Sequence, residues 1–134
     1  MANVLYSLGR EAFLTGNISW SADDVRACLV KSTYTFSDSH QYMSDIGTND
    51  NGRSAALSGK TTTNGTADAS DTSLTATAAT ACNALVVFKH TGVDGTARLI
   101  AYIDTPTSGL PMTPAAGQTV NITWDNGANK IFTL

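Results

Sequence analysis

The C-terminal part of the chain carries the pattern that most restricts its fold, because short apolar and β-branched runs alternate there with turn residues. These runs predict four strands, at Asn83–His90, Arg98–Asp104, Gln118–Asp125 and Lys130–Leu134. The dipeptide Asn126-Gly127 separates the last two, and Asn-Gly is the strongest short-range hairpin signal because both residues tolerate positive φ. We therefore expect the last two strands to pair directly as a hairpin.

Further strands are expected upstream of this region. The alternation of Val25–Lys31 predicts one strand, and Arg53–Thr63 is expected to form another with few bulky side chains. The stretch Thr61–Ala81 consists almost wholly of Thr, Ala, Ser, Asp, Asn and Gly, and two interpretations stay open for it. It has too little apolar area to offset the entropy of ordering, which favours disorder, or Thr72–Thr77 forms a strand suited to β-branched Thr.

The N-terminal segment has helical spacing instead. Asn3–Thr15 is expected to be a helix, with Asn3 as its N-cap and Gly16 at the C′ position that ends it. Such a short helix is marginal alone and must pack somewhere, either over one end of the sheet or as an arm on a neighbouring subunit. The prediction is therefore one domain, 1–134, with a helix or arm at 1–20 and a β domain at 21–134. Its class is all-β, an antiparallel β-sandwich or barrel of about six to eight short strands.

Composition excludes several classes of partner. Only 14% of the 134 residues are charged and the net charge is −3, so the scattered Lys and Arg residues do not form the basic patch that nucleic acid needs. No apolar run approaches the ~20 residues that span a bilayer. The two cysteines, Cys28 and Cys82, could pair, but they are interpreted as small buried side chains in a reducing compartment. A polar but sparsely charged surface suits close packing against another surface, because each buried charge is costly unless paired.

The sequence offers no convincing catalytic or metal-binding motif, and we expect no cofactor. Glu11 is the single glutamate, and the adjacent Asp23 and Asp24 are interpreted as turn or cap acceptors. Asp38, His40 and Asp45 contain ligand types that bind divalent ions, but their spacing matches no ligand framework.

Two further motifs are interpreted as structural. The run 49–52 (NDNG) lacks the alternating acidic ligands of a calcium loop and is predicted to be a turn. Trp124 alternates with Val120 and Ile122, which favours a place in the core over a sugar-stacking surface.

Three segments resemble small virion-associated proteins of tailed bacteriophages. They are LYSLGREAFLTGNISW, TGVDGTARLIAYIDT and ITWDNGANKIF, which together extend over nearly the whole chain but contain no catalytic signature. Within that group, a small acidic β protein looks most like a capsid decoration, or cement, protein. The resemblance implies a place in the virion after synthesis in the host bacterial cytoplasm. It implies the major capsid protein as partner, together with copies of the chain itself.

If the chain is a decoration protein, the apolar residues that the predicted sheet needs least are the expected contacts. These are Leu5, Tyr6, Phe13, Trp20, Tyr42, Met43 and Ile46. The same family setting leaves room for a neck, tail or fibre component. A displayed carbohydrate- or receptor-binding module would instead require exposed aromatic residues in long loops. A small hydrolase would require a polar cluster, for which Glu11, Asp45 and His90 are the candidates.

Overall fold

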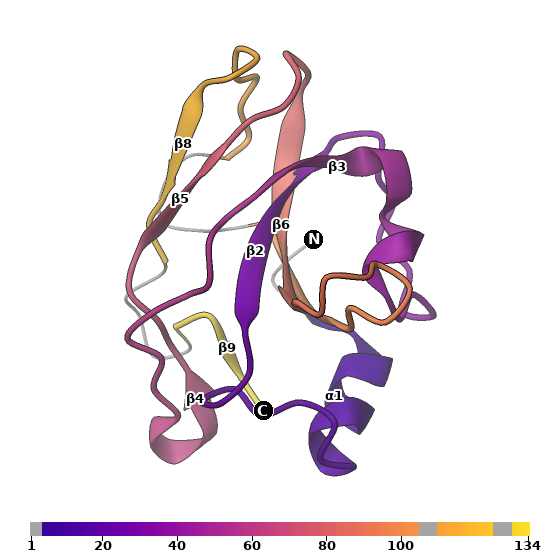
Figure 1. Ribbon diagram of the computed structural model, residues 1–134, viewed down its shortest axis with the longest axis vertical. Coiled ribbons are helices and arrows are strands. Elements are labelled where there is room, and N and C mark those ends of the chain that lie inside the picture. Colours follow the sequence, from indigo (N-terminus) through magenta and orange to yellow (C-terminus); the bar gives the residue numbers. More distant parts are fainter. Residues whose placement is uncertain (1–3, 105–109, 125–129) are drawn as a thin grey trace.

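The computed structural model describes residues 4–104, 110–124 and 130–134, and it is mostly β structure (Figure 1). Three short 3₁₀ helices lie at Met43–Asp45, Gly47–Asn49 and Thr63–Gly65. The remaining elements are β1 (Val4–Leu5), α1 (Ser7–Leu14), β2 (Val25–Lys31), β3 (Asp50–Arg53), β4 (Thr66–Ala67), β5 (Thr72–Thr75), β6 (Cys82–Lys89), β7 (Leu99–Ile103), β8 (Thr119–Ile122) and β9 (Phe132–Thr133). The all-β class predicted from the sequence is therefore confirmed.

A five-stranded antiparallel sheet forms the centre of the molecule. Its strand order is β1-β7-β6-β2-β3, with Leu29 of β2 opposite Leu85 of β6 and Val86 of β6 opposite Tyr102 of β7. Residues 85–88 of β6 are at most 1% exposed, because apolar layers cover both faces of this strand. Within the described residues this sheet stays open and does not close into a barrel.

The four remaining strands form two-stranded ribbons. β5 pairs with β8, and β4 pairs with β9 (Figure 1). Among the described residues β8 and β9 therefore do not pair with each other, and the Asn126-Gly127 turn of the expected hairpin lies outside them. The physical reason is burial: Val120 of β8 lies opposite Leu74 of β5, whereas Phe132 of β9 lies opposite Ala67. A turn signal shows where a chain can reverse, but apolar packing decides which strands pair.

The core has two layers, one on each face of the sheet. One layer lies between the sheet and both ribbons and includes Ala27, Leu85, Leu74 and Ile122. The other lies beneath the loop between β2 and β3 and includes Tyr34. The alternation predicted for Val25–Lys31 is confirmed, because the odd-numbered residues 25–29 join the first layer and residues 28 and 30 join the second.

The N-terminal segment differs from the predicted helix. Val4 and Leu5 form strand β1 opposite Tyr102 and Ala101 of β7, so the helix begins at Ser7; the expected N-cap Asn3 lies outside the described residues. In a helix that began at Asn3 the first amides would have no partner within the helix. In β1 and the residue after it such amides bond to β7 instead, as the Tyr6 amide does to the Ile100 carbonyl.

The predicted C-terminal end of the helix is confirmed. Thr15 caps α1, and Gly16 follows with φ of 80°, the left-handed conformation expected at C′. The described part of residues 1–20 packs against the sheet, as expected of a helix that covers one end.

The segment from residue 49 to residue 63 also differs from the predictions. The run 49–52, expected to be a turn, enters strand β3, where Asn51 is fully buried and its side-chain nitrogen donates to the carbonyl of Ala78. Beyond Arg53 no regular strand continues, although the amides of Ser54 and Leu57 still bond to β2. By contrast, the strand interpretation of Thr72–Thr77 is confirmed by β5.

Candidate functional site: an apolar pocket at one end of the domain

A pocket of about 260 Å³ opens at the end of the molecule where α1, β4 and β9 lie (Figure 1). Its walls come from segments far apart in the sequence. The lining residues are Phe13, Ser19, Trp20, Ser21, Thr62, Gly65, Thr66, Ala67, Phe132 and Leu134. None of their side chains carries a charge. We call this the apolar pocket.

Aromatic rings form the inner wall of the apolar pocket. The ring of Phe132 lies 5.2 Å from that of Trp20, nearly perpendicular to it, and 6.0 Å from that of Phe13. The Trp20 indole nitrogen donates to the carbonyl of Asp68 at 3.2 Å, so the ring is held in place at its polar edge. These edge-to-face and tilted arrangements are the ones that aromatic pairs favour.

Each ring is positioned by a different local structure. α1 ends one residue after Phe13, and the amides of Asn17 and Ile18 both bond back to the Ala12 carbonyl, which turns the chain toward Trp20. Phe132 is held by the pairing of β9 with β4.

One of the most exposed large apolar side chains belongs to the lining of the pocket, and another ends the helix that supplies Phe13. Among the described residues the most exposed are Leu14 (86% exposed), Val93 (60%) and Leu134 (56%). Leu134 lines the apolar pocket, and Leu14 directly follows its wall residue Phe13. Val93 lies in the connection between β6 and β7. An apolar patch rimmed by polar residues is typical of a protein–protein contact.

Most of the contact residues predicted from the sequence are buried. Leu5, Tyr6, Trp20, Met43 and Ile46 are at most 8% exposed, and all five pack in the core. The reasoning that the sheet needs them least is wrong: Leu5 belongs to the sheet itself, and Met43 and Ile46 of the loop between β2 and β3 fill the core layer on one of its faces. A buried side chain cannot reach a partner surface while this fold persists. Trp20 nevertheless lines the apolar pocket.

Phe13 and Tyr42 remain partly exposed. Phe13 lines the apolar pocket, whereas the Tyr42 ring lies against the Arg98 guanidinium at 5.5 Å and pairs with the strand end there. The structure therefore brings Phe13 and Trp20 together and separates both from Tyr42. A role of these residues in binding a partner remains a prediction.

Sequence reasoning missed Phe132 and Leu134. The signal was present, since period-two alternation places residues 132 and 134 on one face of a strand. The hairpin expectation concerned the neighbour before β9 in the sequence and gave no indication of its pairing with β4. Ala67 offered no signal, because a small residue in a Thr-rich stretch does not reveal what packs against it.

The polar groups once considered for a metal site are engaged in structural bonds. The Asp38 carboxylate accepts hydrogen bonds from the amide and hydroxyl of Ser7, which lower its pKa. The Asp45 carboxylate accepts from the amides of Gln41 and Tyr42, with the same effect on its pKa. His40 bonds through Nδ1 to the Tyr34 hydroxyl at 2.7 Å. No group of three or more potential ligands is found within the described residues.

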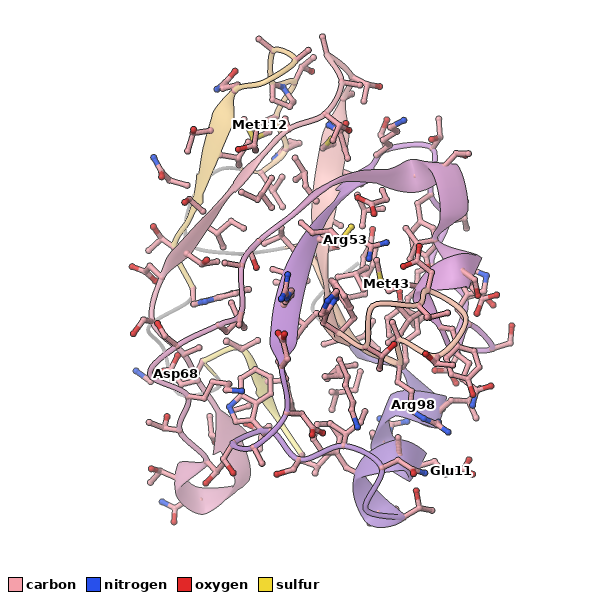
Figure 2. The ribbon with its side chains drawn as sticks, in the orientation of Figure 1. Glu11, Met43, Arg53, Asp68, Arg98 and Met112 are labelled. Carbon is pink, nitrogen blue, oxygen red and sulfur yellow. The ribbon has the colours of Figure 1, made fainter. Side chains whose placement is uncertain are left out.

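The hydrolase candidates are not joined either. Glu11 is exposed on α1 and points outward in Figure 2, and no bond joins it to Asp45 or His90 in the described residues. The interpretation of Asp23 and Asp24 as turn acceptors is confirmed for Asp23, whose carboxylate accepts the Ser19 amide at 2.7 Å.

Both cysteines are free and buried, as expected. Burial raises the pKa of the Cys28 thiol well above its ordinary value, and burial also raises that of Cys82. A raised pKa keeps a thiol protonated and weakly nucleophilic, which does not favour a catalytic role for either residue.

A group of paired charged side chains surrounds Arg53 of β3, which is labelled in Figure 2. The Arg53 guanidinium contacts the carboxylates of Asp50 at 2.6 Å and Asp94 at 2.9 Å, and it lies over the Phe88 ring. Arg26 makes a two-point pair with Asp24 close by. We call these residues the Arg53 network. These charges pair with one another within the molecule. The pair of Arg53 with Asp94 joins β3 to the connection that follows β6.

Comparison with protein families, curated proteins and solved structures finds no match to this chain. Within the described residues, no helix is long and apolar enough to cross a membrane. The features that point to a function are therefore the apolar pocket and the three sequence segments that resemble virion-associated proteins.

Proposed function

We propose that this protein is a bacteriophage virion structural protein, a capsid decoration protein that binds the outer surface of the major capsid protein shell. The observation that carries the proposal is the apolar pocket, whose lining side chains carry no charge and include the exposed Leu134; Leu14, also exposed, ends α1 one residue after Phe13 of the lining. Covering such a surface with a partner costs little desolvation free energy, because no charged side chain is buried. The resemblance to small virion-associated proteins supplies the identity of the partner.

In this proposal the domain acts as a rigid β-sandwich, in which the ribbons pack on one face of the five-stranded sheet. The protein strengthens the shell mechanically by bridging neighbouring capsid subunits and copies of itself. A standard interface buries about 1,600 Å² in total, and shell symmetry repeats it many times. Multivalency then makes a modest affinity for each copy sufficient.

The structure favours the decoration role over a sugar-binding module. Trp20 and Trp124 are 5% and 4% exposed, so neither ring offers a flat stacking surface. Both indole nitrogens already donate to backbone carbonyls, those of Asp68 and Ser70.

The first test is the copy number of the protein in purified particles, measured by mass spectrometry against the major capsid protein. We expect several hundred copies, as a coat over the shell requires. About a dozen copies would place the protein at the neck, tail or fibre, and absence from particles would overturn the virion assignment.

A second test compares two exposed apolar side chains of similar exposure. Leu134→Ser removes an apolar side chain at the pocket, whereas Val93→Ser removes one from a distant turn. We expect Leu134→Ser, and more strongly the double variant with Leu14→Ser, to lower occupancy of the shell. Val93→Ser should leave occupancy unchanged. Equal losses from both sites would show that the pocket is not the contact.

A further inference from the structure

The size of the apolar pocket limits what can occupy it. Its volume of about 260 Å³ is below the range of about 300–1,000 Å³ that holds drug-sized molecules. It is large enough for one bulky side chain. Interfaces between proteins commonly concentrate their affinity in such single anchors, which enter well-packed pockets near the centre of the contact.

The wall of the pocket favours an aromatic anchor. The rings of Phe13, Trp20 and Phe132 already meet at tilted and perpendicular angles, with centroids 5.2 and 6.0 Å apart. A further ring that enters this cluster can repeat the same edge-to-face geometry. An aliphatic side chain would gain burial there but no ring–ring contact.

The electrostatics of the pocket favour a neutral anchor. No lining side chain carries a charge, and the charged groups of the Arg53 network already pair with one another. A charged anchor would thus be desolvated without a partner. The rim instead presents the hydroxyl side chains of Ser19, Ser21 and Thr62, all exposed and able to bond with a partner's main chain.

We propose that the apolar pocket is a receptor for one uncharged aromatic side chain, presented by the partner protein whose main chain lies across the hydroxyl rim. The identity of that partner as the capsid protein rests on the proposed function. The chemistry of the pocket does not, so the two are tested separately.

The experiment is an NMR titration of the isolated full chain with small probes. The probes are the N-acetyl amides of phenylalanine, leucine and lysine. The readout is the indole N–H of Trp20, with that of Trp124 as an internal reference. The two indoles make comparable bonds, each 3.2 Å to a carbonyl oxygen, but only Trp20 lines the pocket.

We expect the phenylalanine amide to shift the Trp20 signal saturably while Trp124 stays unmoved, with a dissociation constant on the order of millimolar for a probe of this size. The leucine amide should bind several-fold more weakly and the lysine amide not detectably. Equal or tighter binding of the leucine amide, or no shift of Trp20 by any probe, would overturn the proposal.

A blocking variant checks that the shift comes from the pocket. Thr62→Trp places a large ring at the exposed rim and should abolish the response of Trp20 to the phenylalanine amide. Ser73→Trp, on the exposed face of β5, is the matched control and should leave the response intact. Persistent binding in Thr62→Trp would locate the probe elsewhere and overturn the assignment.

This titration needs no virus particle, so its result is independent of the proposed function. A chain that binds the aromatic probe but is missing from particles would retain the pocket assignment and lose the virion role. A chain that coats particles but ignores the probe would do the reverse.

Discussion

The Arg53 network and the apolar pocket show two opposite uses of surface in one small chain. In the network, opposite charges form ion pairs within the molecule, and Arg53 pairs with both Asp50 and Asp94. The pocket has no charged side chain in its lining, and the side chain of Leu134 there is exposed, as is that of Leu14 at the end of α1. The scarce charges of this chain therefore pair within its fold, whereas the proposed contact lies where charged side chains are absent.

The largest expected effect tests how rigidly the pocket wall is held. Gly9 lets α1 approach β7 closely, because a Cβ there would lie 2.6 Å from the Leu99 carbonyl oxygen. Gly9→Ala should force the helix away from the sheet and lower the free energy of unfolding by about 3 kcal/mol, measured by urea denaturation. Gly95→Ala, where a Cβ meets nothing within 4 Å, is the control and should have little effect.

If Gly9→Ala were as mild as its control, the helix could shift without strain. The pocket wall at Phe13 would then be adjustable rather than preformed. That result would weaken the contrast between a preformed pocket and an internally paired network.

The next effect tests the structural role of the Arg53 network. Arg53→Ala removes two ion pairs and the contact with the Phe88 ring at a side chain that is 27% exposed. We expect a loss of about 2 kcal/mol in unfolding free energy, between the values typical of exposed and buried pairs. Arg10→Ala, at an exposed helix position, should change stability by less than about 0.5 kcal/mol.

Acid pH should weaken the network and spare the pocket. Hydrogen bonding to Arg53 lowers the pKa of Asp94 below its ordinary 3.8, and Arg26 lowers that of Asp24 in the same way. Because the folded pKa is the lower one, the stabilisation is present above pH 3.8 and is lost as the pH falls through the folded value.

Asp94→Asn should therefore flatten the fall of stability below that pH, by less than about 1 kcal/mol because Asp94 is half exposed and screened by solvent. Chemical denaturation across the acid range measures this change. Binding of the phenylalanine amide at the pocket should be unchanged between about pH 5 and pH 8, since no lining residue titrates there. An affinity that changed with pH in that range would contradict the expectation that only the Arg53 network responds to pH.

The smallest expected effect on stability belongs to Leu14. Its side chain is 86% exposed, so Leu14→Ser should change the unfolding free energy by no more than about 0.5 kcal/mol in a thermal or urea transition. A larger loss would show that Leu14 supports the fold, and its proposed role at the contact would need revision.

Strong local signals in the sequence matched the structure where one strand or one turn was concerned. β2 has the predicted bounds, β6 is covered on both faces, and Gly16 ends α1 as expected. Errors arose where two distant segments compete for a partner. Val4 and Leu5 pair with β7 instead of forming the start of the predicted helix, and β9 pairs with β4 and not with β8 in the described residues.

The candidate site shows the same division. Phe13 and Trp20 were singled out because they are bulky residues in polar surroundings, and the structure places both at the apolar pocket. Met43 and Ile46 were chosen by the same reasoning but fill the core beneath their loop. Bulk in a polar stretch indicates that a side chain must be buried somewhere, without indicating whether its own fold or a partner buries it.

The sequence by itself determined the β class, the low charge and most strand positions, because these depend on residue type and on short-range alternation. Only the tertiary structure decided that β9 crosses to β4 and that three rings from residues 13, 20 and 132 meet in one pocket. The physical reason is range: backbone conformation follows from near neighbours, whereas strand pairing and pockets depend on how segments far apart compete to bury apolar area.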